Sequence, residues 1–279
     1  MTDDAATLPR LFREPTAVRR ADGQRFLWGD EQSGQVADVI YGRGDRISAV
    51  TFSLGPGHWF GASESWKPIY DQHRFYYVVH GTLAIHDPET GDVAVAGPGE
   101  AITWRGARYH FGYNVGDDDV LVLDWFAPKE RLLDVPESSL ASSKRALGEI
   151  RGGRYDLLGT WPERRDDGGI VTVREGDSLR LIHGTQRPQL VSILSSGEEL
   201  TAGTFTVRGG AKTEPEQHPG DEVVYALTGQ LHVHLPESGA WLELEPLDCA
   251  FIPAETSHEY WSYGSAATKA VFCVAPGYR

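Results

Sequence analysis

The feature that most constrains the fold of this chain is an internal repeat. When the 279-residue sequence is shifted by 148 positions, residues 77–110 align with 225–258 without a gap, and 9 of the 34 pairs are identical. His110 and His258 form one of these pairs. Upstream of this block the shift becomes 153, which places five extra residues in the first copy. A duplicated chain of this length predicts two similar domains.

The repeat also suggests where the domains begin and end. We expect a first domain over residues 1–130, a linker over 131–154 and a second domain over 155–279. Within the linker, the segment 138–150 is predicted to form one short helix, because Gly148 near its end suits a helix stop.

Within each copy, apolar and polar residues alternate with a period of two. Residues 231–235 read LHVHL and 241–245 read WLELE, separated by the turn-forming PESGA, and the first copy repeats this as TLAIH, DPETG and DVAVA. Such alternation is typical of half-buried strands joined in hairpins. The 32 glycines and 16 prolines supply frequent tight turns. The predicted fold is therefore all-β, with two tandem antiparallel barrels or sandwiches.

The composition excludes several classes of partner. A formal charge of −14 lacks the basic surface that nucleic-acid binding requires. The acidic start MTDD is unlike a signal peptide, and no apolar run is long enough to span a membrane. We therefore expect a cytoplasmic protein with a small-molecule substrate, no nucleic-acid or membrane partner, and a size compatible with a homodimer. Cys249 and Cys273 lie in apolar strand-like runs and are predicted to be buried, reduced thiols.

Four polar residues of the second copy have the spacing of a metal site. Glu216 and His218 are two apart and share a face of an extended segment, the Pro219–Gly220 turn follows, and Glu222 begins the next strand. His258 lies 36 residues further along, on a strand that the barrel would fold back beside them. Two imidazoles and two carboxylates that converge inside a barrel predict a divalent cation site. The alternative is an acidic, solvated turn.

The types of ligand atom limit the metals that fit the predicted site. Two carboxylates favour Fe²⁺ or Mn²⁺ over copper, and Zn²⁺ or Ni²⁺ also fits. Neighbouring polar residues are assigned other roles: Glu214 is expected to be a solvated charge and Gln217 to face away from the site. His232 and His234 alternate with apolar residues, and a structural role is expected because His86 repeats His234 in the other copy.

These residues resemble the motifs of the cupin superfamily, and the duplication resembles a bicupin. The first motif is matched by Gly210, Glu216-x-His218, Glu222 and Gly229, with Glu216 in place of the usual first histidine. The positions of the second motif are held by Leu247, Pro253, Glu255, His258 and Ser262, of which only the proline and the histidine match. The resemblance implies two jelly-roll β-barrels with one metal site, in the C-terminal barrel.

Several activities accompany this resemblance. The commonest is a non-haem Fe(II) or Mn(II) dioxygenase that acts on a small oxygen-bearing organic molecule. Rivals are a non-redox hydrolase, isomerase or lyase, or a small-molecule-binding cupin without turnover. Bicupins similar to ureidoglycine aminohydrolase also keep a Glu-x-His site only in the second barrel, but this chain departs from them at Glu222 and His258.

The first copy has lost the metal-ligand pattern. The 148-residue shift places Tyr70 and Arg74 where His218 and Glu222 stand, and only His110 persists. We therefore expect no metal there, although a site formed by His58, His73 and His110 is conceivable. Tyr70, Arg74 and His110 could instead bind an anion, and the plainer alternative is that Arg74 forms a salt bridge inside a filled barrel.

Overall fold

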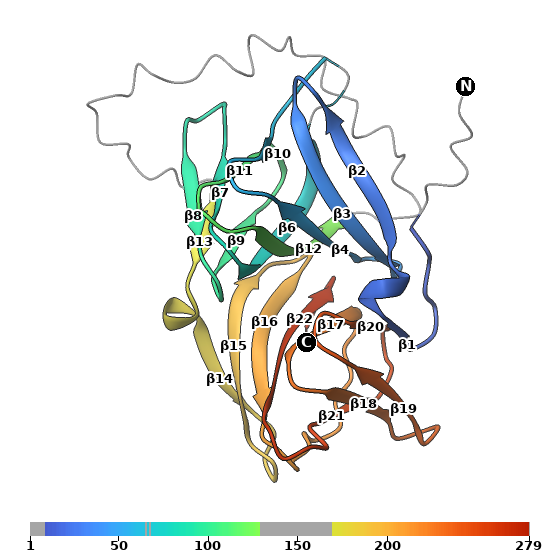
Figure 1. Ribbon diagram of the computed structural model, residues 1–279. Helices are drawn as coiled ribbons and strands as arrows, with labels where there is room; N and C mark the ends of the chain where they lie inside the picture. Colours follow the sequence, from blue (N-terminus) through green and yellow to red (C-terminus); the bar gives the residue numbers. More distant parts are fainter. Residues whose placement is uncertain (1–8, 65, 67, 129–168, 279) are drawn as a thin grey trace. The chain divides into compact units, whose positions relative to one another are not determined.

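The computed structural model describes residues 9–64, 66, 68–128 and 169–278 (Figure 1). Within these residues the regular elements are β-strands and short 3-10 turns, as the alternating pattern predicted. No helix in the described part of the chain has the length and apolar character needed to cross a membrane. The helix expected over 138–150 falls outside the described residues.

The chain divides into two compact units, and the C-terminal one carries the predicted metal ligands. It comprises residues 178–279, 39–50 and the described residues up to 24. A seven-stranded sheet has the order β1-β20-β17-β22-β16-β15-β14, and a three-stranded sheet has the order β19-β18-β21. The bounds are β1 Thr16–Val18, β14 Leu179–His183, β15 Gln189–Ser196, β16 Thr201–Val207, β17 Asp221–Thr228, β18 Leu231–Leu235, β19 Ala240–Leu244, β20 Cys249–Ile252, β21 Glu259–Trp261 and β22 Thr268–Ala275.

The core of this unit lies between its two sheets. Alternate residues of β17 and β22 (Val224, Phe272) pack with alternate residues of β18 and β21 (Leu231, Tyr260), and all of them are nearly inaccessible to solvent. Because side chains of a strand point alternately to opposite faces, this inward set follows the period-two pattern of the sequence. Cys249 and Cys273 are buried and free, as predicted.

The N-terminal unit comprises residues 25–38 and the described residues of 51–177. Its strands are β2 Gln24–Asp30, β5 Trp59–Phe60, β6 Ile69–His80, β7 Leu83–His86, β8 Val93–Ala96, β9 Ala101–Trp104, β10 Ala107–Tyr109, β11 Phe111–Asn114, β12 Val120–Pro128 and β13 Val171–Val173. β3 (Gly34–Arg43) and β4 (Ser48–Leu54) contribute residues to both units. A core that includes Phe52, Tyr76, Ile85 and Trp104 fills this unit.

The strands repeat with the spacing found in the sequence. β7, β9 and β12 begin 148 residues before β18, β20 and β22, and β4 begins 153 residues before β16. The pairings repeat as well, because β6 pairs with β9 and β12 just as β17 pairs with β20 and β22. The predicted duplication of an antiparallel β fold is therefore confirmed.

The compact units do not follow the expected boundaries, because the described residues up to 24 and residues 39–50 group with the second copy and residues 169–177 with the first. β1, at the N-terminal end, pairs with β20, whereas β13, which precedes the second copy, pairs with β9. The short strand before each copy thus extends the sheet of the other copy. A three-residue strand with the sequence TAV or VTV carries no signal for its partner, so only the backbone hydrogen bonds reveal this exchange.

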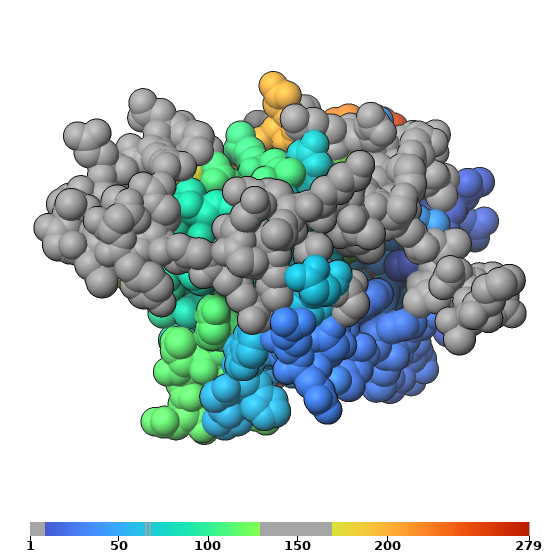
Figure 2. Space-filling view, turned by 90° about the horizontal axis from the view of Figure 1, so that it is seen from above, coloured from blue at the N-terminus to red at the C-terminus, as the bar shows by residue number. Residues whose placement is uncertain are grey.

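The acidic character of the chain is visible on its surface. Asp117, Asp118 and Asp119 are all exposed in the turn between β11 and β12. Green segments of the N-terminal unit lie at the surface in the view of Figure 2. A run of like charges in a turn is solvated and repels phosphate backbones.

Candidate metal centre

Backbone pairing brings the first and last predicted ligands together. Glu216 and His258 form an antiparallel bridge, in which the Glu216 N–H donates to the His258 carbonyl (2.8 Å) and the His258 N–H to the Glu216 carbonyl (2.9 Å). Glu222 follows as the second residue of β17, after a turn in which a side chain at Gly220 would strike the backbone of Ala275. The spacing in the sequence is therefore realised as proximity in space.

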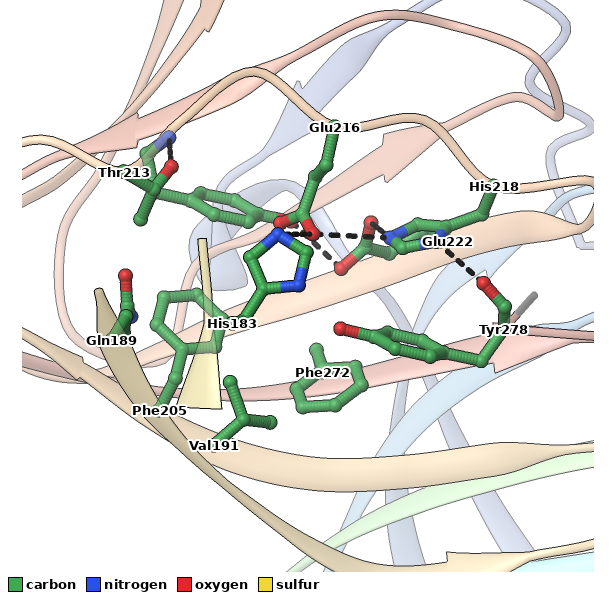
Figure 3. Close-up of a pocket in the computed structure, with 11 residues that line it drawn as sticks. His183, Gln189, Val191, Phe205, Thr213, Glu216, His218, Glu222, Phe272 and Tyr278 are labelled. Carbon is green, nitrogen blue, oxygen red and sulfur yellow. Dashed lines mark hydrogen bonds and ion pairs between the residues drawn. The ribbon is translucent and has the colours of Figure 1, made fainter. Parts of the chain in front are cut away.

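The four predicted ligands converge in one largely buried site. Figure 3 shows three of them, Glu216, His218 and Glu222. Donor atoms of Glu216, His218 and His258 lie within 4.8 Å of one another. Glu222 Oε2 lies 3.0 Å from His258 Nε2 and 3.4 Å from His218 Nε2. His258 and Glu222 are only 1% and 2% exposed. Imidazole and carboxylate groups thus face one another where almost no water reaches them.

Three of the four ligand candidates, His218, Glu222 and His258, are oriented by a further hydrogen bond. Nδ1 of His218 lies 2.9 Å from the Tyr278 carbonyl, and Nδ1 of His258 lies 2.9 Å from the Thr256 carbonyl. Because a carbonyl only accepts, both Nδ1 atoms are the protonated ones and both Nε2 atoms face the site. The Tyr260 hydroxyl donates to Glu222 Oε1 at 2.7 Å, which leaves Oε2 for the site. Metal-ligating histidines and carboxylates are typically held in this way.

The charges of the site are strongly coupled. Burial lowers the pKa of His218, but the hydrogen bond and charge of Glu222 outweigh it and raise the pKa to about 9. Burial raises the pKa of Glu222, but His258 and His218 hold it well below its usual range. Burial and the charge of Glu222 raise the pKa of Glu216. A cation bound between Glu216 and Glu222 would lower the pKa of both carboxyl groups and favour their ionised forms.

The donor set fits a divalent cation. Glu216 Oε2, Glu222 Oε2 and His258 Nε2 are buried and face imidazole or carboxylate groups: Glu222 Oε2 lies 3.0 Å from His258 Nε2, and Glu216 Oε2 lies 3.0 Å from His183 Nε2. Such facing lone pairs are satisfied only when a proton or a cation lies between them. Unsatisfied polar atoms are costly in a protein interior, and three of them that face one another are satisfied together by a cation that accepts their lone pairs. The two carboxylates would also neutralise its double charge.

The backbone conformation expected for the second motif is retained at positions where its glycines are replaced. Leu247 and Glu255 occupy the two glycine positions of that motif, and they adopt positive φ angles of 71° and 60°. This left-handed conformation costs side chains about 1 kcal/mol and suits glycine. Gly99, the first-copy equivalent of Leu247, has a φ of 83°. The turns that flank β20 and lead to His258 are therefore retained without their glycines.

A narrow pocket is lined by Glu216, His218 and Glu222 and includes side chains that the motifs did not predict. Its free space is about 10 Å³, which holds about one water molecule. Val191, Phe205 and Phe272 form an apolar wall (Figure 3). His183 reaches the site from β14, with Nε2 at 3.0 Å from Glu216 Oε2. The one sequence feature that indicates its direction is the two-residue spacing from Leu179 and Leu181, which places all three side chains on one face of β14.

Other polar residues of this unit have structural contacts. Glu214, expected to be a plain solvated charge, accepts hydrogen bonds from three consecutive backbone N–H groups, at residues 185–187. Gln217 lies on the exposed side and contacts Glu255 at 3.4 Å. His232 stacks on Trp241, and His234 lies 2.8 Å from Glu259. The two histidines thus have contacts away from the four ligand candidates.

In the N-terminal unit the predicted pocket residues contact one another: Tyr70 lies against both Arg74 and His110. The Arg74 guanidinium donates to Asp124 at 2.9 Å and to the Tyr76 hydroxyl at 3.2 Å, and it stacks over the rings of Tyr70 and Phe126 at 4.4 and 4.6 Å. Both charged side chains are more than 90% buried. The cation of Arg74 thus stands in the place that the repeat assigns to Glu222.

His110, the remaining equivalent of a ligand, is enclosed by aromatic rings. Trp104 and Tyr70 lie 4.8 and 5.7 Å from its ring centroid. Burial and the charge of Arg74 lower the pKa of His110 to about 3, so it is neutral at ordinary pH. Tyr70 is similarly shielded, and burial raises its pKa to about 12. This geometry matches the salt-bridge alternative more closely than an open anion site.

Comparisons with known proteins identify the fold of the chain and a domain match within its C-terminal part. Residues 203–274 match the cupin domain. The structure is similar to a tryptophan variant of oxalate decarboxylase from Bacillus subtilis (15% identity, 94% of this chain and 77% of that chain, TM-score 0.63). The chain has a bicupin fold.

Two further structures support this fold. A protein of Pseudomonas aeruginosa described as glyoxylate-induced has 13% identity and a TM-score of 0.67, with 100% of this chain and 96% of that chain covered. The formate complex of oxalate decarboxylase from Lactobacillus farciminis has 15% identity and a TM-score of 0.62, with 96% and 88% covered. No curated protein matches the sequence of this bicupin significantly.

Proposed function

We propose that the C-terminal barrel of this bicupin binds one divalent cation through Glu216, His218, Glu222 and His258, and uses it to transform a small organic acid. The observation that carries the proposal is the convergence of buried ligand atoms: donor atoms of Glu216, His218 and His258 lie within 4.8 Å of one another, and Glu222 Oε2 lies 3.0 Å from His258 Nε2. In a barrel with only a structural role, two inward-facing carboxylates would carry a large desolvation cost that no bound cation offsets.

Mn²⁺ and Fe²⁺ are the metals that fit best. Two imidazoles and two carboxylates form a harder donor set than three imidazoles and one carboxylate, and hard donors favour these ions over copper. The first barrel is assigned no metal, because Arg74 already supplies a positive charge there and is paired with Asp124.

The substrate is proposed to be small. Free space of about 10 Å³ beside the ligands leaves room for few atoms unless side chains move. A carboxylate or hydroxyl oxygen would take an open position on the cation, while the carbon skeleton would lie against Phe205 and Phe272. The similar structures include oxalate decarboxylases and one formate complex, which supports short carboxylic acids as the first candidates.

The residues of the chain would contribute orientation and exclusion of water. The bound cation would supply Lewis-acid polarisation of the substrate oxygen. Tyr278 and Thr256 fix the two imidazoles through their carbonyls, and Tyr260 holds Glu222. The apolar wall of the pocket lowers the local dielectric, which strengthens the charge interactions of the site.

Two reaction classes remain candidates. A dioxygenase is the commonest activity implied by the motif resemblance, and a lyase is favoured by the structural similarity to oxalate decarboxylases. They differ in oxygen balance, because a dioxygenase incorporates one O₂ into each product and a lyase incorporates none.

The test is to load the protein with Mn²⁺ or Fe²⁺ and to offer oxalate, glyoxylate and a 1,2-diphenol in a closed oxygen-electrode cell. We expect turnover that requires the metal. One O₂ consumed per product supports the dioxygenase, and product without net oxygen uptake supports the lyase. Tight metal binding without turnover of any of these compounds would instead indicate a binding protein.

A further inference from the structure

The β14–β15 hairpin forms one wall of the pocket beside the metal ligands. In the register of the two strands, His183 pairs with Gln189 and Leu181 pairs with Val191. Directly opposed residues of an antiparallel pair project to the same face. His183 and Gln189 therefore lie on the pocket side of the hairpin, and both line the pocket (Figure 3).

The turn of this hairpin is fastened to the segment that carries Glu216. Glu214 Oε1 accepts hydrogen bonds from the N–H groups of Thr185 (2.8 Å), Gln186 and Arg187 (2.8 Å). The Arg187 guanidinium donates to the Thr213 carbonyl at 2.6 Å. The N–H groups of Arg187 and its neighbours lower the pKa of Glu214, as expected for an ionised carboxylate that caps a turn. These bonds hold His183 and Gln189 at a fixed place above the ligands.

His183 differs from the two histidines assigned to the metal. Nδ1 of His218 and of His258 each bond a backbone carbonyl, whereas Nδ1 of His183 is buried and makes no hydrogen bond. Ligating imidazoles are almost always fixed through the second nitrogen. His183 also stands outside the group of Glu216, His218 and His258 whose donor atoms all lie within 4.8 Å of one another. The Nδ1 atom of His183 is therefore available to form a hydrogen bond with a bound ligand.

From these observations, and resting on the proposed metal site, we propose that His183 and Gln189 are the specificity-determining residues of the pocket. They would donate hydrogen bonds to the oxygen atoms of a short carboxylate whose other oxygen is on the cation. The ring of His183 and the amide of Gln189 offer donors in a pocket that is otherwise lined in part by the apolar Phe205 and Phe272 (Figure 3). A dicarboxylate or 2-oxo acid of two carbons has the acceptors that this arrangement favours, and because the free space is about that of one water molecule, side chains would have to move to admit it.

The experiment uses Mn²⁺ as its own spectroscopic probe. Wild-type protein, His183→Ala and Gln189→Ala are loaded with Mn²⁺, and the electron paramagnetic resonance spectrum is followed during titration with oxalate and, separately, with glyoxylate. Removing one hydrogen-bond donor to a charged group should raise the titration midpoint about tenfold or more in each variant. Manganese stoichiometry should stay at one per chain in both variants. Gln189→Ala should change the manganese affinity by less than about threefold, whereas His183→Ala also removes the 3.0 Å contact to Glu216 and should weaken the affinity by no more than the roughly 10–100-fold typical of a residue that supports a ligand. His183→Gln, which keeps a donor, should recover part of the loss.

Ile182→Ala is the matched control, since Ile182 is adjacent on β14, 64% exposed and on the opposite face. It should leave both the manganese affinity and the midpoint unchanged. Loss of manganese in His183→Ala to the extent expected for His218→Ala would make His183 a ligand and overturn the inference. Wild-type midpoints in His183→Ala and Gln189→Ala, or no response of manganese-loaded wild type to either acid, would also overturn it. A wild-type protein that binds no Mn²⁺ would instead refute the proposed metal site itself.

Discussion

Replacing His258 with alanine should remove the metal from the protein. His258 Nε2 faces Glu222 at 3.0 Å, and the side chain is 1% exposed, so no other group can take its place. We expect the affinity for Mn²⁺ to fall on the order of a hundredfold or more, beyond the loss typical of residues that only support a ligand. A ligand at a hundred times its dissociation constant stabilises a folded protein by about 2.7 kcal/mol. The melting temperature of wild type should therefore rise with added Mn²⁺, and that of His258→Ala should not.

The repeat provides a matched control for this variant. His110 is the first-copy equivalent of His258, and it is enclosed by rings rather than by donors. His110→Ala should lower stability through lost packing but keep wild-type metal content and the wild-type response to Mn²⁺. Metal content retained in His258→Ala, or lost in His110→Ala, would contradict the assignment of the site to the second barrel.

Replacing Arg74 with methionine should cause the largest loss of stability in the N-terminal unit. The guanidinium is the partner of Asp124, and both are more than 90% buried, so the substitution leaves an uncompensated buried carboxylate. Breaking one partner of a buried ion pair typically costs about 3–5 kcal/mol. Urea unfolding followed by tryptophan fluorescence measures this, because Trp125 and Trp104 are buried in the same unit. The double variant Arg74→Met/Asp124→Leu should recover most of the loss.

The loss should depend on pH in a defined direction. Burial raises the pKa of Asp124 to about 6 even though Arg74 opposes it. A carboxyl group with a raised pKa in the folded state favours folding at low pH, and this contribution is lost as the pH rises through the folded value. Without Arg74 the pKa should rise further. Arg74→Met should therefore be less defective at pH 5 than at pH 8.

The same variant tests the anion-site alternative for the first barrel. If Arg74 served only the salt bridge, metal content and oxalate response of Arg74→Met would match wild type below its unfolding transition. A selective loss of oxalate or glyoxylate binding, with the double variant failing to restore it, would argue for an anion site at Tyr70, Arg74 and His110.

The main features of the fold could be predicted from the sequence because they leave periodic signals. The 148-residue shift and the two-residue alternation are both reproduced in strand positions and pairings, as β7 and β18 illustrate. The clustering of Glu216, His218 and His258 also follows from spacing, because strand geometry determines which side chains share a face.

Other features depend on long-range contacts that leave no local signal. His183 lies 33 residues before Glu216 and belongs to no motif, so only the fold places it at the site. Asp124 pairs with Arg74 across 50 residues, and a single aspartate within the apolar run VLVLDWFAP was the only hint of a buried partner. The exchange of β1 and β13 rests on backbone hydrogen bonds, which carry no residue-specific information.

The most direct measurement of the central claim is anomalous diffraction from crystals of the wild-type protein grown with Mn²⁺. The account predicts one strong manganese peak per chain, with Glu216, His218, Glu222 and His258 at about 2.0–2.3 Å from the ion, and no peak beside Arg74. A site in which Glu216 instead stood apart from the ion would restrict the ligands to the other three residues. Absence of a peak between His218 and His258, or a second peak in the first barrel, would contradict the account.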